Sequence, residues 1–251
     1  MDGIGRFGGG TQVVAHRGFH AGGLDENSLP AFEAAAQLGA DVLELDIHRT
    51  RDGVLVVHHD AHVRDGRRIA DLNFAELPRL PHGAAIPTLV EVADLANRTG
   101  VRVAAELKEP GYESLAVQQL VTHMPRERVE MISFNRDSIR AVERLDPTLT
   151  TGLLEPSLPA WLRATALYPA AMWLLDRLGL HLSIDAAAAV GADYVSIEQT
   201  AATDEFIAEA HERGMGVDVW TVDDVPTMRR LVAAGVRGIV TDRPDLLRRL
   251  T

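Results

Sequence analysis

Two carboxylates, Glu44 and Asp46, stand two residues apart inside an otherwise apolar run at residues 42–47. Successive side chains of a strand point to opposite faces, so both carboxylates share one face of a strand formed by this run. Burying two unpaired carboxylates is costly. A divalent cation would keep both ionised, and oxygen-only ligation favours Mg²⁺ or Ca²⁺ over zinc. Salt bridges to arginine or lysine are the alternative that the spacing leaves open.

A second apolar run, residues 101–107, carries Glu106 near its end and leads into Lys108. The spacing of two residues again places both charges on one face of a strand. Glu106 is therefore a candidate third metal ligand, and Lys108 a candidate point charge for a phosphate oxygen. The alternative is a Glu-Lys pair on an exposed strand end.

Two histidines follow apolar runs: His16 after residues 12–15, and His59 at the end of residues 54–58. Cleavage of a phosphodiester needs a base for the attacking hydroxyl and an acid for the leaving alkoxide, and imidazole serves as either near neutral pH. Each histidine alone is equally explained as a structural residue bonded to backbone. That interpretation is given to His20, His48, His58, His62, His82, His123, His181 and His211.

Eight short apolar runs alternate with longer alanine- and leucine-rich stretches, which is typical of βα units around a parallel sheet. The runs are residues 12–15, 42–47, 101–107, 130–134, 150–154, 194–197, 217–221 and 238–241. The expected helices are residues 28–38, 89–97, 112–123, 136–145, 184–190, 204–213 and 225–234. The alternation predicts one (β/α)8 barrel domain over residues 1–251, with its active site at the C-terminal ends of the strands.

The run at residues 54–58 follows the second run after Arg51-Asp52-Gly53. This connection is too short for a parallel crossover, so an extra hairpin strand is expected after the second barrel strand.

Composition excludes several classes of protein. The formal charge is −11 and the basic residues are scattered, so nucleic acid is not an expected partner. There is no cysteine, which excludes disulfides, thiolate zinc sites and cysteine nucleophiles. The first ten residues lack the apolar core of a signal peptide, and no apolar stretch is long enough for a membrane span. A cytoplasmic enzyme is expected.

Two further features have local as well as functional explanations. Glu26-Asn27-Ser28 precedes an expected helix and, with Pro30, is typical of a helix N-terminus. Trp220 lies near the end of the seventh run, where it forms either an aromatic wall beside a ligand or part of the core.

Seven motifs occur in order along nearly the whole chain. They are His16-Arg17-Gly18, Glu26-Asn27-Ser28, GADVLELD at residues 39–46, Val57-His58-His59-Asp60, Glu106-Leu107-Lys108, Trp220-Thr221-Val222 and GIVTDRP at residues 238–244. Each motif is weak alone. Together they resemble the glycerophosphodiester phosphodiesterase family.

The resemblance implies a TIM-type barrel of the phospholipase C-like phosphodiesterase kind. It also implies a divalent ion bound by Glu44, Asp46 and Glu106, with His16 and His59 as general base and acid. The family hydrolyses glycerophosphodiesters such as glycerophosphocholine to sn-glycerol 3-phosphate and an alcohol.

Further roles are implied by the same resemblance. Arg17 and Lys108 would bind the phosphate, and Trp220 would contact the substrate. Three more residues would support the site: Glu26, Asn27 and Asp242.

The chain departs from the family pattern at three places. Ser28 stands where threonine is usual, Asp223 where asparagine is usual, and the segment at residues 61–87 is short. The last two departures bear on substrate preference rather than on reaction type.

Residues 156–182 hold two of the three tryptophans. This segment is interpreted either as an extra helix packed on the barrel or as an apolar lid that accommodates an acyl chain or touches a membrane. Three functions follow: a glycerophosphodiesterase, a lysophospholipase D-type enzyme on the same scaffold, and a non-catalytic module that binds phosphodiesters.

Overall fold

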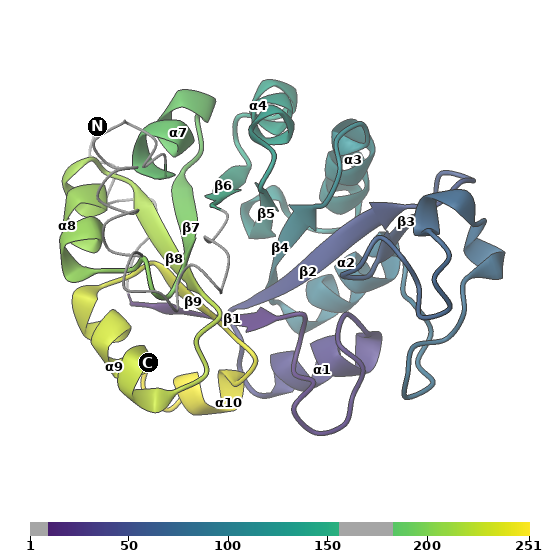
Figure 1. Cartoon of the computed structure of the whole chain (residues 1–251), viewed down its shortest axis with the longest axis horizontal. Coiled ribbons are helices and arrows are strands. Elements are labelled where there is room, and N and C mark those ends of the chain that lie inside the picture. The colour runs from purple at the N-terminus through teal and green to yellow at the C-terminus, as the bar shows by residue number, and fades with distance from the viewer. Residues whose placement is uncertain (1–9, 156–182) are drawn as a thin grey trace.

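The computed structural model describes residues 10–155 and 183–251. Within these ranges eight parallel strands close into a barrel, because β1 pairs with both β2 and β9. The strands are β1 (Gln12–His16), β2 (Val42–Arg49), β4 (Arg102–Leu107), β5 (Val129–Ser133), β6 (Thr150–Leu154), β7 (Tyr194–Glu198), β8 (Gly216–Trp220) and β9 (Gly238–Thr241). The predicted barrel is confirmed, and Figure 1 shows the helices on its outside.

A ninth strand, β3 (Leu55–Val57), runs antiparallel to β2. The connecting turn includes Gly53, whose φ is 86° and whose N–H donates to the Thr50 carbonyl at 3.0 Å. The predicted hairpin after the second barrel strand is therefore confirmed.

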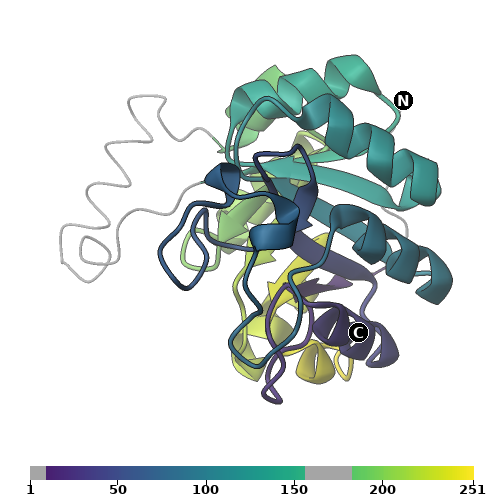
Figure 2. The ribbon, with the colours of Figure 1, turned by 90° about the vertical axis from the view of Figure 1, so that its right-hand side faces the viewer.

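The seven predicted helices are found within two residues at either end. In chain order, the helices are α1 (Leu29–Gln37), α2 (Leu89–Thr99), α3 (Glu113–His123), α4 (Arg136–Leu145), α7 (Ser183–Val190), α8 (Asp204–Glu212), α9 (Val225–Ala234) and α10 (Pro244–Leu247). α10 is not predicted, because four residues are too few to show a helical period. Figure 2 shows α1 to α4 following one another along one side of the barrel.

Alternate residues of β2 meet different surroundings. Leu43, Leu45 and Ile47 are fully buried in the large apolar cluster that also contains buried residues of α1 and α2. Glu44 and Asp46 take the other face, toward the barrel interior, as the alternation predicts. The sequence of β2 therefore fixes which side chains are available for chemistry.

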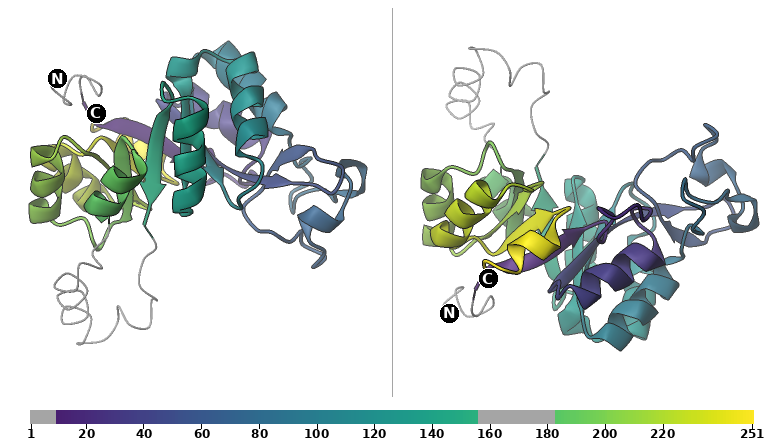
Figure 3. Two further views of the ribbon diagram at one scale, coloured as in Figure 1. Left: turned by 90° about the horizontal axis from the view of Figure 1, so that it is seen from above. Right: turned by 90° about the horizontal axis from the view of Figure 1, so that it is seen from below.

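The segment between β3 and α2 packs on a small apolar cluster of its own. It contains two 3₁₀ turns, Ile69–Asp71 and Phe74–Glu76. Figure 3 shows this segment beside the ends of β2 and β3, away from α8 and α9. It therefore borders the barrel on the side where β2 ends.

The opposite end of the barrel holds a buried ionic network. Arg237 donates from Nη2 to Glu130 Oε2 at 2.9 Å and from Nε to Asp218 Oδ1 at 2.8 Å. Tyr194 donates its hydroxyl to the same Glu130 oxygen at 2.9 Å. Its ring fills the barrel centre because Gly152 has no Cβ, which would otherwise lie 2.4 Å from that ring. Two of its members, Tyr194 and Asp218, also line the cavity of about 140 Å³ that holds the candidate site.

Candidate active site

Three carboxylates gather at the C-terminal end of the barrel. Glu44 and Asp46 come from β2, and Glu106 comes from the adjacent strand β4, where it is the register partner of Asp46. All three are buried, and one oxygen from each lies within 4.8 Å of the others. The structure therefore brings together the three predicted metal ligands.

The carboxylates are short of positive charge. Burial, with repulsion from Asp46, raises the pKa of Glu44 to about 7. Burial and the neighbouring carboxylates raise the pKa of Glu106 to about 8, although Lys108 opposes them. Burial also disfavours ionised Asp46, but Lys108 and Arg17 outweigh it and lower its pKa to about 2. Three carboxylate oxygens whose negative charge is not fully compensated fit a hard divalent cation such as Mg²⁺ or Ca²⁺.

The alternative of salt bridges is realised only in part. Lys108 Nζ lies 2.8 Å from Asp46 Oδ1 and 2.9 Å from Glu106 Oε1, and Arg17 Nε lies 3.2 Å from Asp46 Oδ2. Within the described part of the chain, Glu44 forms no ion pair, and its Oε2 accepts only from the backbone N–H of Arg17 at 3.1 Å. Among the described residues, the two basic side chains therefore form ion pairs with Asp46 and Glu106 but not with Glu44.

The turn after β1 is shaped to aim Arg17 at the carboxylates. Arg17 has a φ of 54°, a left-handed conformation that is rare for residues other than glycine. Gly18 follows with a φ of 83°, and a Cβ there would lie 2.7 Å from the Ala31 carbonyl carbon. Only glycine lets the turn approach α1 this closely, which explains the glycine at position 18, directly after His16 and Arg17.

Glu26 and Asn27 support the same cluster. Arg17 Nη1 donates to Glu26 Oε1 at 3.1 Å, and Asn27 Nδ2 donates to Asp46 Oδ2 at 2.7 Å. Asn27 also has a left-handed φ, 53°. Ser28 caps α1 by accepting from the Ala31 N–H at 3.3 Å. The motif thus has both of its expected uses, as a helix start and as a support of the carboxylates.

His16 ends β1 and donates from Nδ1 to Asp242 Oδ1 at 2.7 Å. Burial alone would lower its pKa, but this bond and the nearby Glu44 raise it above the ordinary value. With Nδ1 held by Asp242, the free Nε2 is the nitrogen that remains for proton transfer.

His59 follows β3 and is about one-third exposed, with its Nδ1 2.9 Å from Asp60 Oδ1. Burial and the nearby Arg17 lower its pKa. His48 accounts for its backbone position, because His48 Nε2 lies 3.1 Å from the His59 carbonyl oxygen and Nδ1 lies 2.7 Å from Glu109 Oε1. The two candidate histidines therefore have pKa values shifted in opposite directions.

The interpretation of further histidines as structural residues bonded to backbone is confirmed for His48 and His58, which contact the carbonyl oxygens of His59 and Asp60, and is wrong for three others. His20 is expected to be a structural histidine bonded to backbone, but its Nε2 lies 3.2 Å from Asp242 Oδ1, the same oxygen that binds His16. His82 and His123 likewise bond carboxylates, Asp25 and Asp94, rather than backbone. Spacing cannot reveal these pairs because each joins residues far apart in the chain.

A cavity of about 140 Å³ joins these groups. Its charged and titratable lining consists of His16, Arg17, Glu44, His59, Glu106 and Lys108, with Tyr194 and Asp218 of the ionic network. The opposite wall is apolar and includes Trp220 and Phe134, whose rings meet edge to face with centroids 6.1 Å apart. Phe134 is 43% exposed and is not predicted as a site residue. Its position directly after β5 is the signal that could have indicated it.

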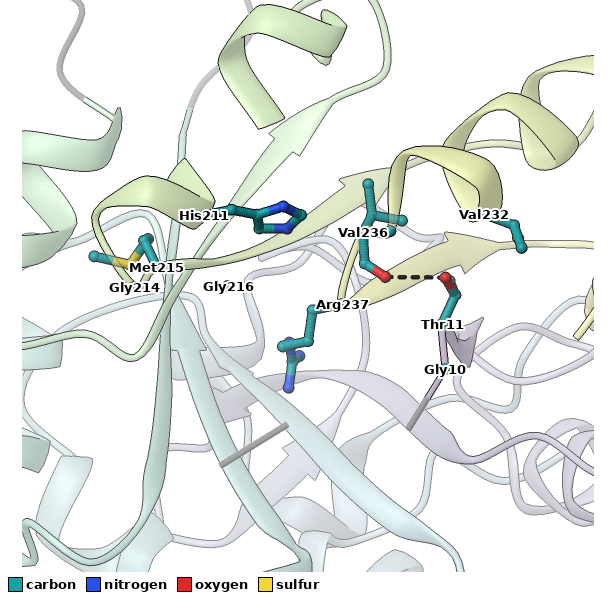
Figure 4. A pocket seen from close by; sticks show the side chains of 10 residues that line it. Gly10, Thr11, His211, Gly214, Met215, Gly216, Val232, Val236 and Arg237 are labelled. Atoms are coloured by element: carbon teal, nitrogen blue, oxygen red, sulfur yellow. Dashed lines mark hydrogen bonds between the residues drawn. The ribbon is translucent and has the colours of Figure 1, made fainter. Parts of the chain in front are cut away.

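A larger cavity of about 400 Å³ lies at the other end of the barrel (Figure 4). Thr11, which donates to the Val236 carbonyl at 3.0 Å, lines it together with His211 and Arg237. Its described lining contains no carboxylate, and Arg237 serves the ionic network. Active sites of these barrels lie at the C-terminal ends of the strands. The smaller cavity is therefore the candidate active site.

Two expectations concern membranes. The segment at residues 156–182, interpreted as an extra helix or a lid, lies outside the described residues. Among the helices that are described, none has the length and apolar character to cross a membrane.

Comparisons with known proteins agree with the geometry. Residues 16–246 match the sequence model of the glycerophosphoryl diester phosphodiesterase family. A glycerophosphodiester phosphodiesterase of Caldanaerobacter subterraneus subsp. tengcongensis is 32% identical over 94% of this chain and 96% of its own length. A probable glycerophosphodiester phosphodiesterase 2 of Mycobacterium tuberculosis is also 32% identical, over 96% of this chain and 90% of its own.

A solved structure shares the fold. The crystal structure of a glycerophosphodiester phosphodiesterase from Parabacteroides distasonis superposes with a TM-score of 0.80 at 27% identity and covers 96% of both chains. The resemblance carried by the seven motifs is confirmed. The chain belongs to the glycerophosphoryl diester phosphodiesterase family.

Proposed function

We propose that the protein hydrolyses glycerophosphodiesters to sn-glycerol 3-phosphate and an alcohol, with Mg²⁺ or Ca²⁺ bound at the carboxylates. The observation that carries the proposal is one cavity lined by two histidines, two basic side chains and carboxylates of the buried cluster. The names of the relatives support the same reaction.

The metal would be held by Glu44, Asp46 and Glu106. The raised pKa values of Glu44 and Glu106 support this, because a divalent cation would stabilise their ionised forms. When bound, such an ion neutralises charge on the phosphoryl oxygens of the transition state.

His16 is the proposed general base. Its raised pKa makes it a stronger proton acceptor, and Asp242 stabilises the imidazolium that forms when Nε2 takes the proton. His59 is the proposed general acid. Its lowered pKa makes the protonated ring a stronger donor toward the leaving alkoxide.

Arg17 and Lys108 are the proposed phosphate ligands. Both side chains line the cavity and contact the carboxylates, so a phosphate there would meet two cationic donors. Trp220 and Phe134 form the apolar wall opposite these charges, and we assign to them contact with the carbon chain of the glycerol or the alcohol.

Release of sn-glycerol 3-phosphate from glycerophosphocholine tests the proposal, with lysophosphatidylcholine as the parallel substrate. We expect release from the soluble diester and its loss in His59→Ala. Cleavage of the lysophospholipid alone would favour the lysophospholipase D alternative. Tight binding of both diesters without turnover would favour the non-catalytic module.

A further inference from the structure

A second group of metal-ligating side chains lies beside the carboxylate cluster. His16 Nδ1 and His20 Nε2 approach the same oxygen of Asp242, at 2.7 and 3.2 Å. One ligand atom from each of the three residues lies within 4.8 Å of the others. Their side chains are 19%, 24% and 32% exposed, so solvent reaches the group.

The chemistry of this group differs from that of the carboxylates. Two imidazoles and one carboxylate suit zinc and similar transition metals, whereas Mg²⁺ and Ca²⁺ prefer oxygen alone. Zinc binds nitrogen at about 2.0–2.1 Å, so neighbouring ligands of a tetrahedral ion stand about 3.4 Å apart. The present contacts come close to that separation without any movement of backbone. Three protein ligands would leave a fourth position for water.

The surroundings offer access to this group. A depression of about 550 Å³, bounded by the segment between β3 and α2, includes His20 in its lining. Four other histidines also line it: His58, His59, His62 and His82. Imidazole is the commonest protein ligand of transition metals, and this depression leads to His20 from solvent.

We propose that His16, His20 and Asp242 form a zinc site that is distinct from the carboxylate cluster and inhibits the enzyme when filled. Zinc takes the places of the protons on His16 Nδ1 and His20 Nε2, and each neutral ring keeps one proton, on the other ring nitrogen; any further proton is released to solvent. With zinc on Nδ1 and a proton on Nε2, His16 has no free nitrogen with which to act as a base. The inhibition rests on the proposed role of His16 as general base, whereas the binding of zinc does not.

Zinc affinity of the metal-free protein is the direct test, measured by competition with a chromophoric chelator in excess Mg²⁺. The variants are His20→Ala and His20→Gln, the second of which keeps a hydrogen-bond donor for Asp242. His123→Ala is the matched control, because His123 forms the same kind of bond with Asp94, at 2.8 Å, but belongs to no metal-ligating group among the described residues.

We expect both His20 variants to bind zinc at least about tenfold more weakly than the wild type, and His123→Ala to match the wild type. Zinc should inhibit release of sn-glycerol 3-phosphate in the wild type, and at least about tenfold more zinc should be needed in the His20 variants, each compared with its own uninhibited rate. Binding that depends on His20 in a protein without diesterase activity would support the site while refuting the proposed reaction. Equal zinc affinity in His20→Ala and His123→Ala would overturn the site. Equal inhibition in these two variants would overturn its inhibitory role.

Discussion

His16 and Asp242 lie 226 residues apart in the chain, yet their side chains form a hydrogen bond of 2.7 Å. The bond exists because β1 and β9, the first and last strands of the barrel, pair side by side and close it. The pairing that closes the barrel therefore also places the proposed base beside its carboxylate partner. A change that loosens the pairing of β1 with β9 should disturb His16 first.

Asp242→Asn should shift the pH dependence of the reaction. Without the carboxylate, burial lowers the pKa of His16, so the base is deprotonated at lower pH. The acidic limb of the kcat/KM profile should move to lower pH, while the plateau falls at least about tenfold because the imidazolium loses its partner. An acidic limb at the same pH as in the wild type would show that Asp242 does not set the pKa of the catalytic base.

Replacing either histidine should nearly abolish turnover. His16→Ala and His59→Ala should each lower kcat by about two to four orders of magnitude, the usual contribution of general acid-base catalysis. His123→Ala is the control, since its histidine bonds a carboxylate on the outer helices. The rates are measured with glycerophosphocholine at saturating metal, and near-native turnover in one variant would remove that histidine from the mechanism.

Glu44→Gln should stabilise the metal-free fold at high pH. The pKa of the Glu44 carboxyl is 4.5 in the unfolded chain and about 7 in the folded protein. The folded protein therefore loses stability as the pH rises through this window, because the unfolded chain gives up the proton first. The full penalty is about 3 kcal/mol above pH 7. Urea unfolding should therefore favour the variant near pH 8 and show no difference near pH 4.

In saturating Mg²⁺ or Ca²⁺ the order of stability should reverse, because only the wild type retains all three ligands. A variant that keeps its full metal affinity would contradict the assignment of Glu44 as a ligand.

Lys108 offers a direct view of the site, because it is the only lysine among the 25 lysine and arginine residues of the chain. Protein labelled with ¹³C at the lysine Cε should give a single Cε signal. Mg²⁺ or Ca²⁺ should move this signal, since Lys108 bridges Asp46 and Glu106. Glu44→Gln should need at least about tenfold more metal for the same shift. If the chemical shift of Lys108 Cε did not change at metal concentrations that support activity, the ion would have to bind elsewhere.

The sequence predicts much of the site because its main signals are local. Glu44 and Asp46 share a strand face through their spacing of two, and the eight runs predict the barrel whose strand ends bring them to Glu106. The same alternation of faces predicts that Leu43 packs against helices.

Other parts of the site depend on contacts that no local pattern reveals. His20 joins Asp242 only through closure of the barrel, and Phe134 reaches Trp220 from a strand three positions away around it. The ionic network of Arg237 with Glu130 is hidden for the same reason, because 107 residues separate its partners. A charged residue in a strand-like run predicts an interior polar group but not its partner.

A catalytic metal at the three carboxylates is best tested by release of sn-glycerol 3-phosphate from glycerophosphocholine by chelated protein, before and after Mg²⁺ or Ca²⁺ is returned. We expect no release from the chelated protein, restoration by the metal, and no restoration in Glu106→Gln at the same concentration. Release that persists in full after chelation, or that returns equally in Glu106→Gln, would contradict a catalytic metal at the three carboxylates.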